Sequence, residues 1–475
     1  MNKLKKYNTS GILGISHRYL KNFKNDNNLN TAIKYAIPEL NKIKNDNLLD
    51  SKFIQKDILN FYNNDTISPF SPVSAKGPWI IGNNGSIIYD TGGYGMLGYG
   101  HCPDWALQTM SKPHVMANIM TPNNMHHEFT ELIKSKIGIN RAKQECPYTH
   151  FAFLNSGSEG MEFALRLSDI DNYDNNKPSG FIVLENGFHG RTTSASIISN
   201  SCLKTYSNNL KSYKTNYPVF TVKLNNVLNL QEQFLFAMNT YNINAIVMEP
   251  VMGEGNPGEM LSKDFYNTAR NLTNKYNSLF IIDSVQAGIR TNGYLSVVDY
   301  PTLKNEKAPD IEVFSKAINA GQYPLSVIAV NDNVANKFKT GIYGNTMTGN
   351  PKALDIGFET LKRLTPELIS NIQTKGIIFK QMLQNVKNRF PYIADNVTGQ
   401  GLLLALHIKK EYPVVNSTCG LEYLCRKNGL NVIHGGENAL RFTPYFLITD
   451  KEIKLVEKIL IQTFNQYAEK HIRNI

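Results

Sequence analysis

The sequence predicts an α/β protein in which a large domain built on a mainly parallel sheet is followed by a smaller α/β domain. Three observations support this prediction. From about residue 77, short runs rich in Val, Ile and Phe alternate with helix-like segments; Gly, Asn and Pro separate the runs; and the pattern changes after Asn350-Pro351. Such runs are typical of buried strands, and their alternation with helices favours parallel pairing.

The elements are expected in the following order. The strands of the large domain are 86–90, 149–156, 180–185, 243–249, 278–284, 310–315 and 325–330, with a helix at 262–277. One long amphipathic helix is expected at 352–389. A short strand-helix set should follow at 401–408, 421–429, 430–434 and 439–444, before a final helix that begins at Asp450.

These elements divide the 475 residues into three parts. They are a mostly helical N-terminal segment at 1–75, a large domain at 76–350 and a C-terminal small domain at 351–475. More than one domain is expected at this length, because single hydrophobic cores rarely grow past about 250–300 residues.

The composition argues against several classes of partner. No stretch approaches the roughly 20 consecutive apolar residues of a membrane span. The formal net charge is +11, but Lys and Arg are scattered along the chain, which favours anionic small molecules over nucleic acid. Five widely spaced cysteines fit neither a disulfide framework nor a zinc site, so no metal is expected. The cytoplasm is the expected compartment; a basic N-terminus leaves import into mitochondria or another organelle open.

Residues 93–98 match the G-x-G-x-x-G pattern of dinucleotide sites. Such a site also needs a helix that opens on the third glycine. Here Gly100-His101-Cys102-Pro103 interrupts the chain instead, so a dinucleotide cofactor is not expected.

Residues 155–160, Asn-Ser-Gly-Ser-Glu-Gly, follow a predicted strand and open a predicted helix. Backbone N–H groups at a helix start, with a serine hydroxyl beside them, bind anions such as phosphate. A plain N-cap at Ser156 or Ser158 explains the same residues equally well. This segment alone leaves both interpretations open.

Two charged residues end neighbouring predicted strands. Asp283 ends 278–284, where a buried carboxylate is costly unless it meets a cation such as a protonated pyridine nitrogen. Lys316 follows 310–315, and the separation of 316 − 283 = 33 residues suits one strand-helix-strand excursion back to the same sheet edge. A turn-capping aspartate and a surface lysine are the simpler explanations for each residue taken alone.

Six motifs occur in one order along the chain. They are NSGSEG (155–160), GFHGRT (187–192), MEPVMGEG (248–255), IIDSVQAGI (281–289), SKAINAG (315–321) and GNTMTGNP (344–351). With them, residues 75–470 resemble the class III (ω-amino acid) aminotransferases, fold-type I enzymes that use pyridoxal 5′-phosphate (PLP). The resemblance implies that fold, PLP as cofactor, and ping-pong transfer of an amino group from an amino acid or ω-amino donor to a keto acid such as 2-oxoglutarate.

The resemblance also implies roles around the cofactor ring. Lys316 would be the Schiff-base lysine and the acid/base that moves the proton. Asp283 would pair with the pyridine nitrogen, and Gln286 would approach the ring hydroxyl. Phe188 would stack on the ring, with His189 beside it as a further cofactor contact.

The resemblance extends to the phosphate and to a second subunit. Gly157 and Ser158 would hold the phosphate of PLP. Thr346 would reach the phosphate bound by the neighbouring subunit, which implies a homodimer with active sites at the interface.

Four residues would contact the substrate. Arg441 matches the arginine that binds the α-carboxylate, a task that suits a planar guanidinium. Glu254 would pair with Arg441 when an ω-amino group is presented and swing away for an α-amino acid. Arg191 would take the other carboxylate, and Tyr94 is the pocket aromatic. The alternative is that Glu254 and Arg191 are ordinary ion-pair partners.

The chain departs from the family pattern at two places. Ser284 stands where an acidic residue is usual, and Met347-Thr348 replaces the usual aromatic residue. Neither change removes a catalytic group, but both alter the surroundings of the site. Two other functions stay open: a PLP-dependent aminomutase or racemase of the same fold, and a non-catalytic dimeric binding module.

Overall fold

The computed structural model describes residues 4, 14–43, 51–60, 62–116, 120–171, 176–214 and 218–471. The chain forms two compact units. We call Trp105–Ser370 the central unit, and Met1–Asp104 together with Asn371–Ile475 the terminal unit. This division differs from the three consecutive parts expected from the sequence, because the first 104 residues join the C-terminal ones.

The central unit is built on a seven-stranded sheet with the order β4-β10-β9-β8-β7-β5-β6. Its strands are β4 (His150–Leu154), β5 (Ser179–Leu184), β6 (Val219–Val222), β7 (Asn242–Met248), β8 (Leu279–Asp283), β9 (Ile311–Phe314) and β10 (Ser326–Val330). Strand β10 is antiparallel to β4 and β9, whereas β9, β8, β7, β5 and β6 pair in parallel. The mainly parallel sheet is confirmed. Because β4 and β9 both oppose β10, all strands except β10 end at one sheet edge.

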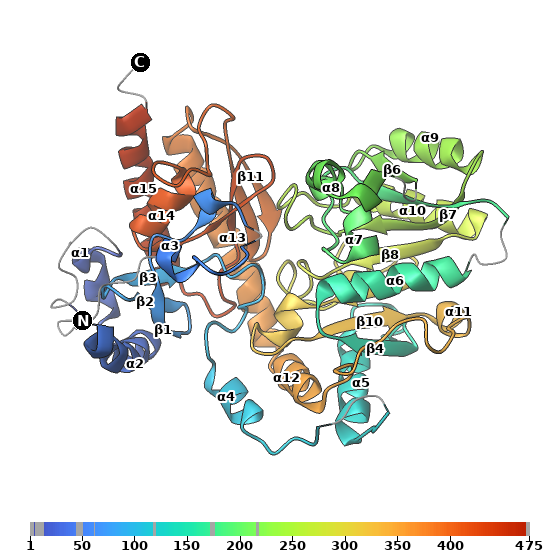
Figure 1. Ribbon diagram of the computed structural model, residues 1–475, viewed down its shortest axis with the longest axis horizontal. Coiled ribbons are helices and arrows are strands. Elements are labelled where there is room, and N and C mark those ends of the chain that lie inside the picture. Colours follow the sequence, from blue (N-terminus) through green and yellow to red (C-terminus); the bar gives the residue numbers. More distant parts are fainter. Residues whose placement is uncertain are drawn as a thin grey trace. The chain divides into compact units, whose positions relative to one another are not determined.

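Different helices cover the two faces of this sheet. Ile281 on β8 belongs to a buried apolar cluster with residues of α6 (Gly157–Asp171), which lies across the strands in Figure 1. The adjacent Phe280 contacts Tyr266 of α10 (Lys263–Tyr276), with ring centroids 5.0 Å apart. Successive side chains of a strand point to opposite faces, so α6 and α10 lie on opposite sides of the sheet.

The other helices of the central unit are mostly short. They are α4 (Asp104–Met110), α5 (Asn124–Lys136), α7 (Thr193–Ile197), α8 (Leu203–Asn209), α9 (Val227–Met238) and α11 (Asp332–Ala335), with 3₁₀ turns η4 (Asn200–Cys202), η5 (Lys211–Lys214), η6 (Val297–Asp299) and η7 (Lys316–Asn319).

The expectation of a single helix at 352–389 is wrong. The structure has two helices, α12 (Pro351–Lys362) and α13 (Pro366–Arg389). Proline has no backbone N–H and is accommodated in the first turn of a helix rather than in its interior. Pro366 therefore ends one helix and begins the next, and Asn350 caps α12 by accepting a 2.9 Å hydrogen bond from the Lys352 N–H.

The terminal unit holds two four-stranded sheets. One has the order β1 (Pro72–Lys76), β2 (Trp79–Gly82), β3 (Ile87–Asp90) and β13 (Leu430–Asn431); the other has the order β11 (Ala394–Gln400), β12 (Leu403–Ile408), β15 (Ala439–Phe442) and β14 (Ile433–Gly435). Its helices are α1 (His17–Leu20), η2 (Lys21–Phe23), α2 (Asn27–Ile43), α3 (Ser51–Ile54), η3 (Asn64–Thr66), α14 (Leu421–Lys427) and α15 (Asp450–His471). The strand expected at 430–434 is thus divided at Val432 between two sheets.

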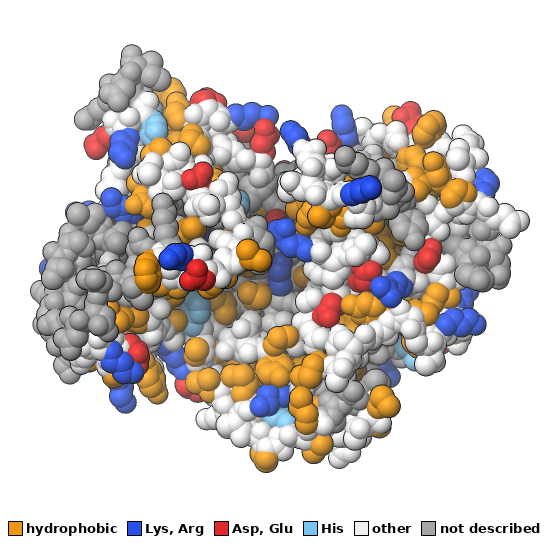
Figure 2. All heavy atoms as spheres, viewed as in Figure 1, with side chains coloured by type: hydrophobic (Ala, Val, Ile, Leu, Met, Phe, Trp, Pro, Cys, Tyr) orange, Lys and Arg blue, Asp and Glu red, His pale blue; other side chains and the backbone are white. Residues whose placement is uncertain are grey.

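The distribution of Lys and Arg on the surface of the described residues agrees with their scatter along the sequence. Figure 2 shows Lys and Arg side chains separated by other residues across the face in view. Within the ranges that the structure describes, no helix combines the length and apolar character needed to cross a membrane.

Candidate active site

The sheet edge where the parallel strands end gathers most of the predicted cofactor residues. Asp283 is the last residue of β8, and Lys316 lies two residues beyond β9. Phe188 and His189 follow β5, and Gly157 begins α6 directly after β4. Ligands of open α/β sheets bind beyond the carboxyl ends of the strands, so this edge is the candidate active site.

Asp283 is a buried carboxylate held by two donors. The Nδ1 of His189 donates a 2.8 Å hydrogen bond to Oδ2, and the Val285 N–H donates to Oδ1 at 3.1 Å. Burial by itself would lower the pKa of His189, but the hydrogen bond and charge of Asp283 outweigh burial and raise that pKa above its ordinary value. The hydrogen bond to Asp283 thus favours the protonated form of His189.

Glu249 is a second buried carboxylate, and sequence reasoning did not single it out. It directly follows β7 and accepts hydrogen bonds from the N–H groups of Phe188 (3.0 Å) and Gly253 (2.9 Å). Burial raises the pKa of Glu249 to about 7. In the sequence, Glu249 could have been recognised, like Asp283, by its position at the end of an apolar strand. Glu249 fixes the backbone that carries Phe188.

Gln286 lies against the backbone of Gly253. A Cβ atom at position 253 would fall 2.2 Å from the carboxamide carbon of Gln286, so a larger residue there would require the Gln286 side chain to move. Gln286 is buried. The structure therefore fixes the predicted ring-hydroxyl residue between the β8 end and the 248–255 motif.

Lys316 begins the 3₁₀ turn η7 and is half-buried. Its φ of +49° lies in the left-handed region, which is uncommon for a residue with a side chain and recurs at functional sites. The flanking Ser315 Oγ and Asn319 Nδ2 both donate to the Leu325 carbonyl, at 2.8 and 3.0 Å. These bonds hold the unusual turn that directs Lys316.

At the start of α6 the N-cap interpretation is confirmed, and phosphate binding stays a prediction. Ser156 is the cap, because its Oγ accepts from the Glu159 N–H at 3.2 Å and donates to the Glu159 carboxylate at 3.1 Å. Ser158 lies inside the first turn, where its Oγ accepts from the Arg191 N–H at 3.1 Å. A Cβ at Gly190 would fall 2.6 Å from this Oγ, so the 187–192 motif packs directly on the predicted phosphate nest.

The 344–351 motif lies beside the same nest. Asn345 accepts from Asn155 Nδ2 and donates to Glu159 Oε1, both at 3.1 Å. Thr346 follows and is exposed. Its contact with a neighbouring subunit stays a prediction.

Arg191 and Glu254 lie close together in the central unit. Their nearest side-chain atoms, Nη2 and Oε1, are 4.0 Å apart, and the guanidinium carbon of Arg191 is 5.5 Å from the centre of the Phe188 ring. The ion pair that the sequence left as the alternative is therefore present. The pair of Glu254 with Arg441 stays a prediction.

Glu312 is a third buried carboxylate that sequence reasoning missed. It lies inside β9 and accepts from Ser284 Oγ (2.5 Å), Tyr148 Oη (2.8 Å), the Val297 N–H (2.9 Å) and Ser296 Oγ. In the sequence, Glu312 could have been found as a charged residue within an apolar strand. The hydroxyl at position 284, where the family usually has an acid, thus donates to a carboxylate on the neighbouring strand.

The terminal unit brings together two predicted substrate residues. The guanidinium carbon of Arg441, a buried residue of β15, lies 6.0 Å from the centre of the Tyr94 ring. Tyr94 has a φ of +52°, and its ring also lies 5.9 Å from that of Tyr62. Burial raises the pKa of Tyr94 to about 12, so the phenol stays neutral.

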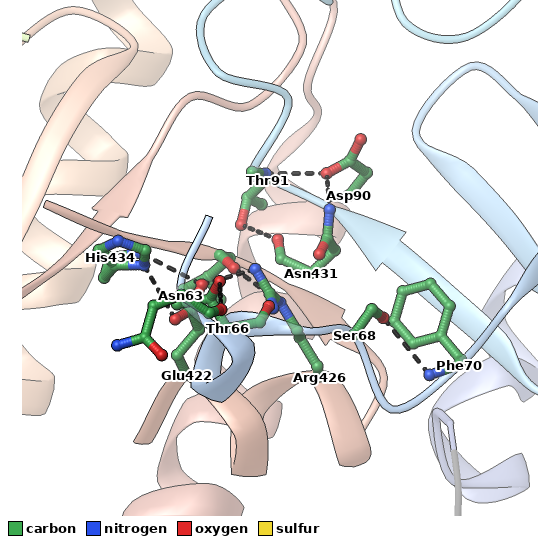
Figure 3. A network of polar contacts seen from close by, with 12 residues as sticks. Asn63, Thr66, Ser68, Phe70, Asp90, Thr91, Glu422, Arg426, Asn431 and His434 are labelled. Carbon is green, nitrogen blue, oxygen red and sulfur yellow. Dashed lines mark hydrogen bonds and ion pairs between the residues drawn. The ribbon is translucent and has the colours of Figure 1, made fainter. Parts of the chain in front are cut away.

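A polar network behind these residues ties the N-terminal segment to α14. Figure 3 shows Arg426 reaching toward Thr66 and Glu422. Its guanidinium donates to the Thr66 carbonyl at 2.6 Å and to Glu422 at 2.5 Å. Glu422 also accepts from His434 Nδ1 at 3.0 Å. The segment before β1 is therefore fixed to the C-terminal part of the same unit.

The sheet edge fits PLP. It offers a serine-lined helix start for a phosphate, a buried Asp283 for a ring nitrogen, the Phe188 ring and the Lys316 amine. The Nε2 of His189 is buried and has no hydrogen-bond partner among the described residues, which indicates that a further polar group belongs beside it. A mainly parallel sheet with these groups at its carboxyl edge defines a PLP-dependent enzyme of fold type I.

Comparison with known proteins narrows this class. Residues 61–464 match the family model of the class-III aminotransferases. The ornithine aminotransferase of Plasmodium chabaudi chabaudi is 29% identical over 406 residues, covering 83% of this chain and 92% of the relative. The acetylornithine aminotransferase of Prochlorococcus marinus is 29% identical over 332 residues, covering 68% and 75%.

A solved structure shows the same fold. The ornithine aminotransferase of Toxoplasma gondii superimposes with a TM-score of 0.76 at 22% identity, covering 90% of this chain and 97% of that one. The chain belongs to the class III aminotransferases, PLP-dependent enzymes that transfer an amino group to a keto acid.

Proposed function

We propose that the amino donor is an ω-amino acid of the ornithine type and that Lys316 attaches PLP covalently as a Schiff base. The donor class is supported by the relatives, which include ornithine and acetylornithine aminotransferases. The attachment is supported by one observation above the others. Lys316 is held in a left-handed turn at the same sheet edge as the buried Asp283–His189 pair.

The side chains at this sheet edge have different proposed roles in the reaction. When bound, PLP supplies an electron sink that weakens the C–H bond next to the transferred nitrogen. Asp283, oriented by its hydrogen bond from His189, would pair with the ring nitrogen. Lys316 Nζ would hold and move the proton that leaves the donor carbon. Glu249 positions Phe188 against the ring through its backbone N–H.

The phosphate and a second subunit complete the proposal. Gly157 and Ser158 bind the phosphate at the start of α6, where the helix dipole favours an anion. Thr346 reaches the phosphate of the neighbouring subunit in a homodimer. Arg441 and Tyr94 of the terminal unit would bind one carboxylate of a substrate, and Arg191 of the central unit would bind another carboxylate.

The cytoplasm remains the proposed compartment. All five cysteines are free thiols, which suits a reducing environment. Because curated relatives include mitochondrial enzymes, fractionation of cells that express the tagged full chain is the test, and recovery in an organelle would contradict the proposal.

Substitution of Lys316 tests the covalent attachment. Lys316→Ala should fold, yet lose borohydride-reducible attachment of PLP and both half-reactions, because no other side chain replaces the amine. Lys304→Ala removes an exposed lysine of the same unit and should behave as the parent. Reductive attachment to the same extent in Lys316→Ala would show that another lysine carries the cofactor.

The donor is tested by a paired screen. Ornithine, N-acetylornithine, 4-aminobutyrate and lysine are each combined with 2-oxoglutarate and with pyruvate. We expect the highest kcat/KM for an ornithine-type donor with 2-oxoglutarate. A clear preference for 4-aminobutyrate, which lacks an α-amino group, would overturn the proposed donor class and leave the transaminase chemistry intact.

A further inference from the structure

Arg191 is held from two sides by groups of different charge. Its Nη1 lies 3.3 Å from the hydroxyl of Tyr206, to which it donates a hydrogen bond, and its Nη2 lies 4.0 Å from the carboxylate of Glu254. The guanidinium also faces the ring of Phe188. Tyr206 belongs to α8 and to none of the six family-like motifs.

Tyr206 is itself fixed by a closed ring of contacts. Its ring lies 5.3 Å from that of Tyr213 at an interplanar angle of 37°. The Tyr213 hydroxyl contacts Ser196 Oγ and donates to the Thr193 carbonyl at 3.4 Å. Ser196 and Thr193 both belong to α7, the helix that begins just after Arg191. Tyr206 is thus braced against the segment that carries the arginine it binds.

The contacts of Arg191 with Glu254 and with Tyr206 differ in their effect on its charge. Glu254 is a loose partner, because its side chain and that of Arg191 are 31% and 41% exposed and the closest approach is 4.0 Å; solvent screens such a pair strongly. The Tyr206 phenol accepts a hydrogen bond without cancelling charge. The orientation given by Tyr206 therefore leaves a positive, planar donor group for an incoming carboxylate.

We propose that Tyr206 is a specificity-determining residue that orients Arg191 toward the second carboxylate of a dicarboxylic keto acid. The inference rests on the proposed amino transfer and on the proposed role of Arg191, and it adds the residue that orients this arginine. Tyr206 acts through Arg191 and is a positioning residue.

Loss of one hydroxyl tests this role. Tyr206→Phe keeps the ring stack and removes the acceptor, so KM for 2-oxoglutarate should rise about threefold to tenfold with kcat unchanged, the pattern of lost uniform binding. KM for pyruvate, which has one carboxylate, should change less than about twofold. Tyr276→Phe is the matched control, since Tyr276 ends α10 and contacts Phe234 instead, and it should behave as the parent with both acids.

A second substitution separates orientation from a general structural effect. In an Arg191→Lys background, Tyr206→Phe should no longer change the ratio of the two KM values, because the planar group that it orients is gone. Equal losses with both keto acids, or an unchanged KM for 2-oxoglutarate, would overturn the role of Tyr206. Absence of amino transfer by the parent with every acid would instead overturn the proposed function.

Discussion

Three buried carboxylates, Asp283, Glu249 and Glu312, lie on adjacent strands of the central sheet, and each meets different donors. Asp283 faces an imidazole, Glu249 two backbone N–H groups, and Glu312 three hydroxyls and one N–H. A buried charge is tolerated only with a partner or a shifted pKa. Asp283 accepts a hydrogen bond from His189 and raises the pKa of that imidazole, whereas burial raises the pKa of the other two carboxyls to about 7.

Glu312 should make stability depend on pH. Burial raises the pKa of its carboxyl to about 7 from an ordinary 4.5, so the folded state holds a proton that the unfolded chain releases. The resulting stability is fully present below about pH 4 and is lost as pH rises through 7, up to about 3 kcal/mol. Glu312→Gln cannot ionise, so its unfolding free energy relative to the parent should improve from pH 5 to pH 8 in urea titrations. A difference that stays constant with pH would refute this assignment.

Asp283 should be required for rate rather than for cofactor attachment. Asp283→Asn keeps an acceptor for His189 but removes the charge opposite the ring nitrogen, so kcat should fall at least about a hundredfold. Visible absorbance of the purified variant should show that PLP remains bound. Asp332→Asn, at an exposed position of α11, is the control. A kcat within about threefold of the parent value would show that Asp283 is not a catalytic residue.

At the level of elements, apolar runs predicted the large sheet well. Six of the seven runs overlap strands of the large sheet, because buried strands of a parallel sheet are almost continuously apolar. The run at 86–90 was wrongly placed there: it overlaps β3, which belongs to a sheet of the terminal unit. Short or partly exposed strands were missed: β6 (Val219–Val222) has three half-buried residues out of four. The break between α12 and α13 was missed because the apolar periodicity continues across it, although Pro366 marked the break.

The candidate site was predictable where a residue ends a strand or belongs to a motif. Asp283 and Lys316 were found in this way, and the structure places both at one sheet edge. Glu312 was not found, because its role depends on hydroxyls contributed by distant segments, such as Tyr148. Tyr206 was missed for the same reason, since its contact with Arg191 depends on how α8 packs against the 187–192 segment.

Gly376 should be indispensable to the packing of α13. In an isolated helix, Gly→Ala is stabilising by about 1 kcal/mol. Here the new Cβ would fall 2.4 Å from the Gly401 Cα in the turn between β11 and β12, and a backbone cannot move aside as a flexible side chain can. Gly376→Ala should therefore lower the unfolding free energy by about 1–3 kcal/mol.

Thermal or urea unfolding, followed by a spectroscopic signal from the terminal unit, measures this change in the unfolding free energy. Thr374→Ala, an exposed position on the same helix, should have little effect on the unfolding free energy. A stabilised Gly376→Ala variant would mean that helix propensity outweighs the contact with Gly401.

At the scale of the whole chain, its two ends build one unit. Strand β3 pairs in parallel with β13, and Thr91 Oγ1 donates to the Asn431 carbonyl at 2.9 Å, 340 residues along the chain. Local patterns report which segments are strands and leave such distant pairings undetermined. The sequence accordingly predicted three consecutive parts, where the structure joins the first and last.

The proposed homodimer leads to a complementation test. If Thr346 of one subunit serves the PLP held by Lys316 of the other, each site needs both chains. A heterodimer of one Lys316→Ala chain and one Thr346→Ala chain then contains one site with both residues intact and one site with neither. Size-exclusion chromatography with light scattering should first show that the parent and both single variants are dimers.

Cofactor affinity of the mixed dimer decides between the two arrangements. Thr346→Ala homodimers should bind PLP more weakly than the parent, because one hydroxyl donor to the phosphate is lost. Lys316→Ala homodimers should be inactive. The purified heterodimer should regain about half of the parent activity with the parent PLP affinity, since its one complete site is unaltered. If Thr346 instead contacts the PLP of its own subunit, the heterodimer site that keeps Lys316 lacks Thr346. That site then binds PLP as weakly as the Thr346→Ala homodimer, and activity recovers only at high PLP concentration.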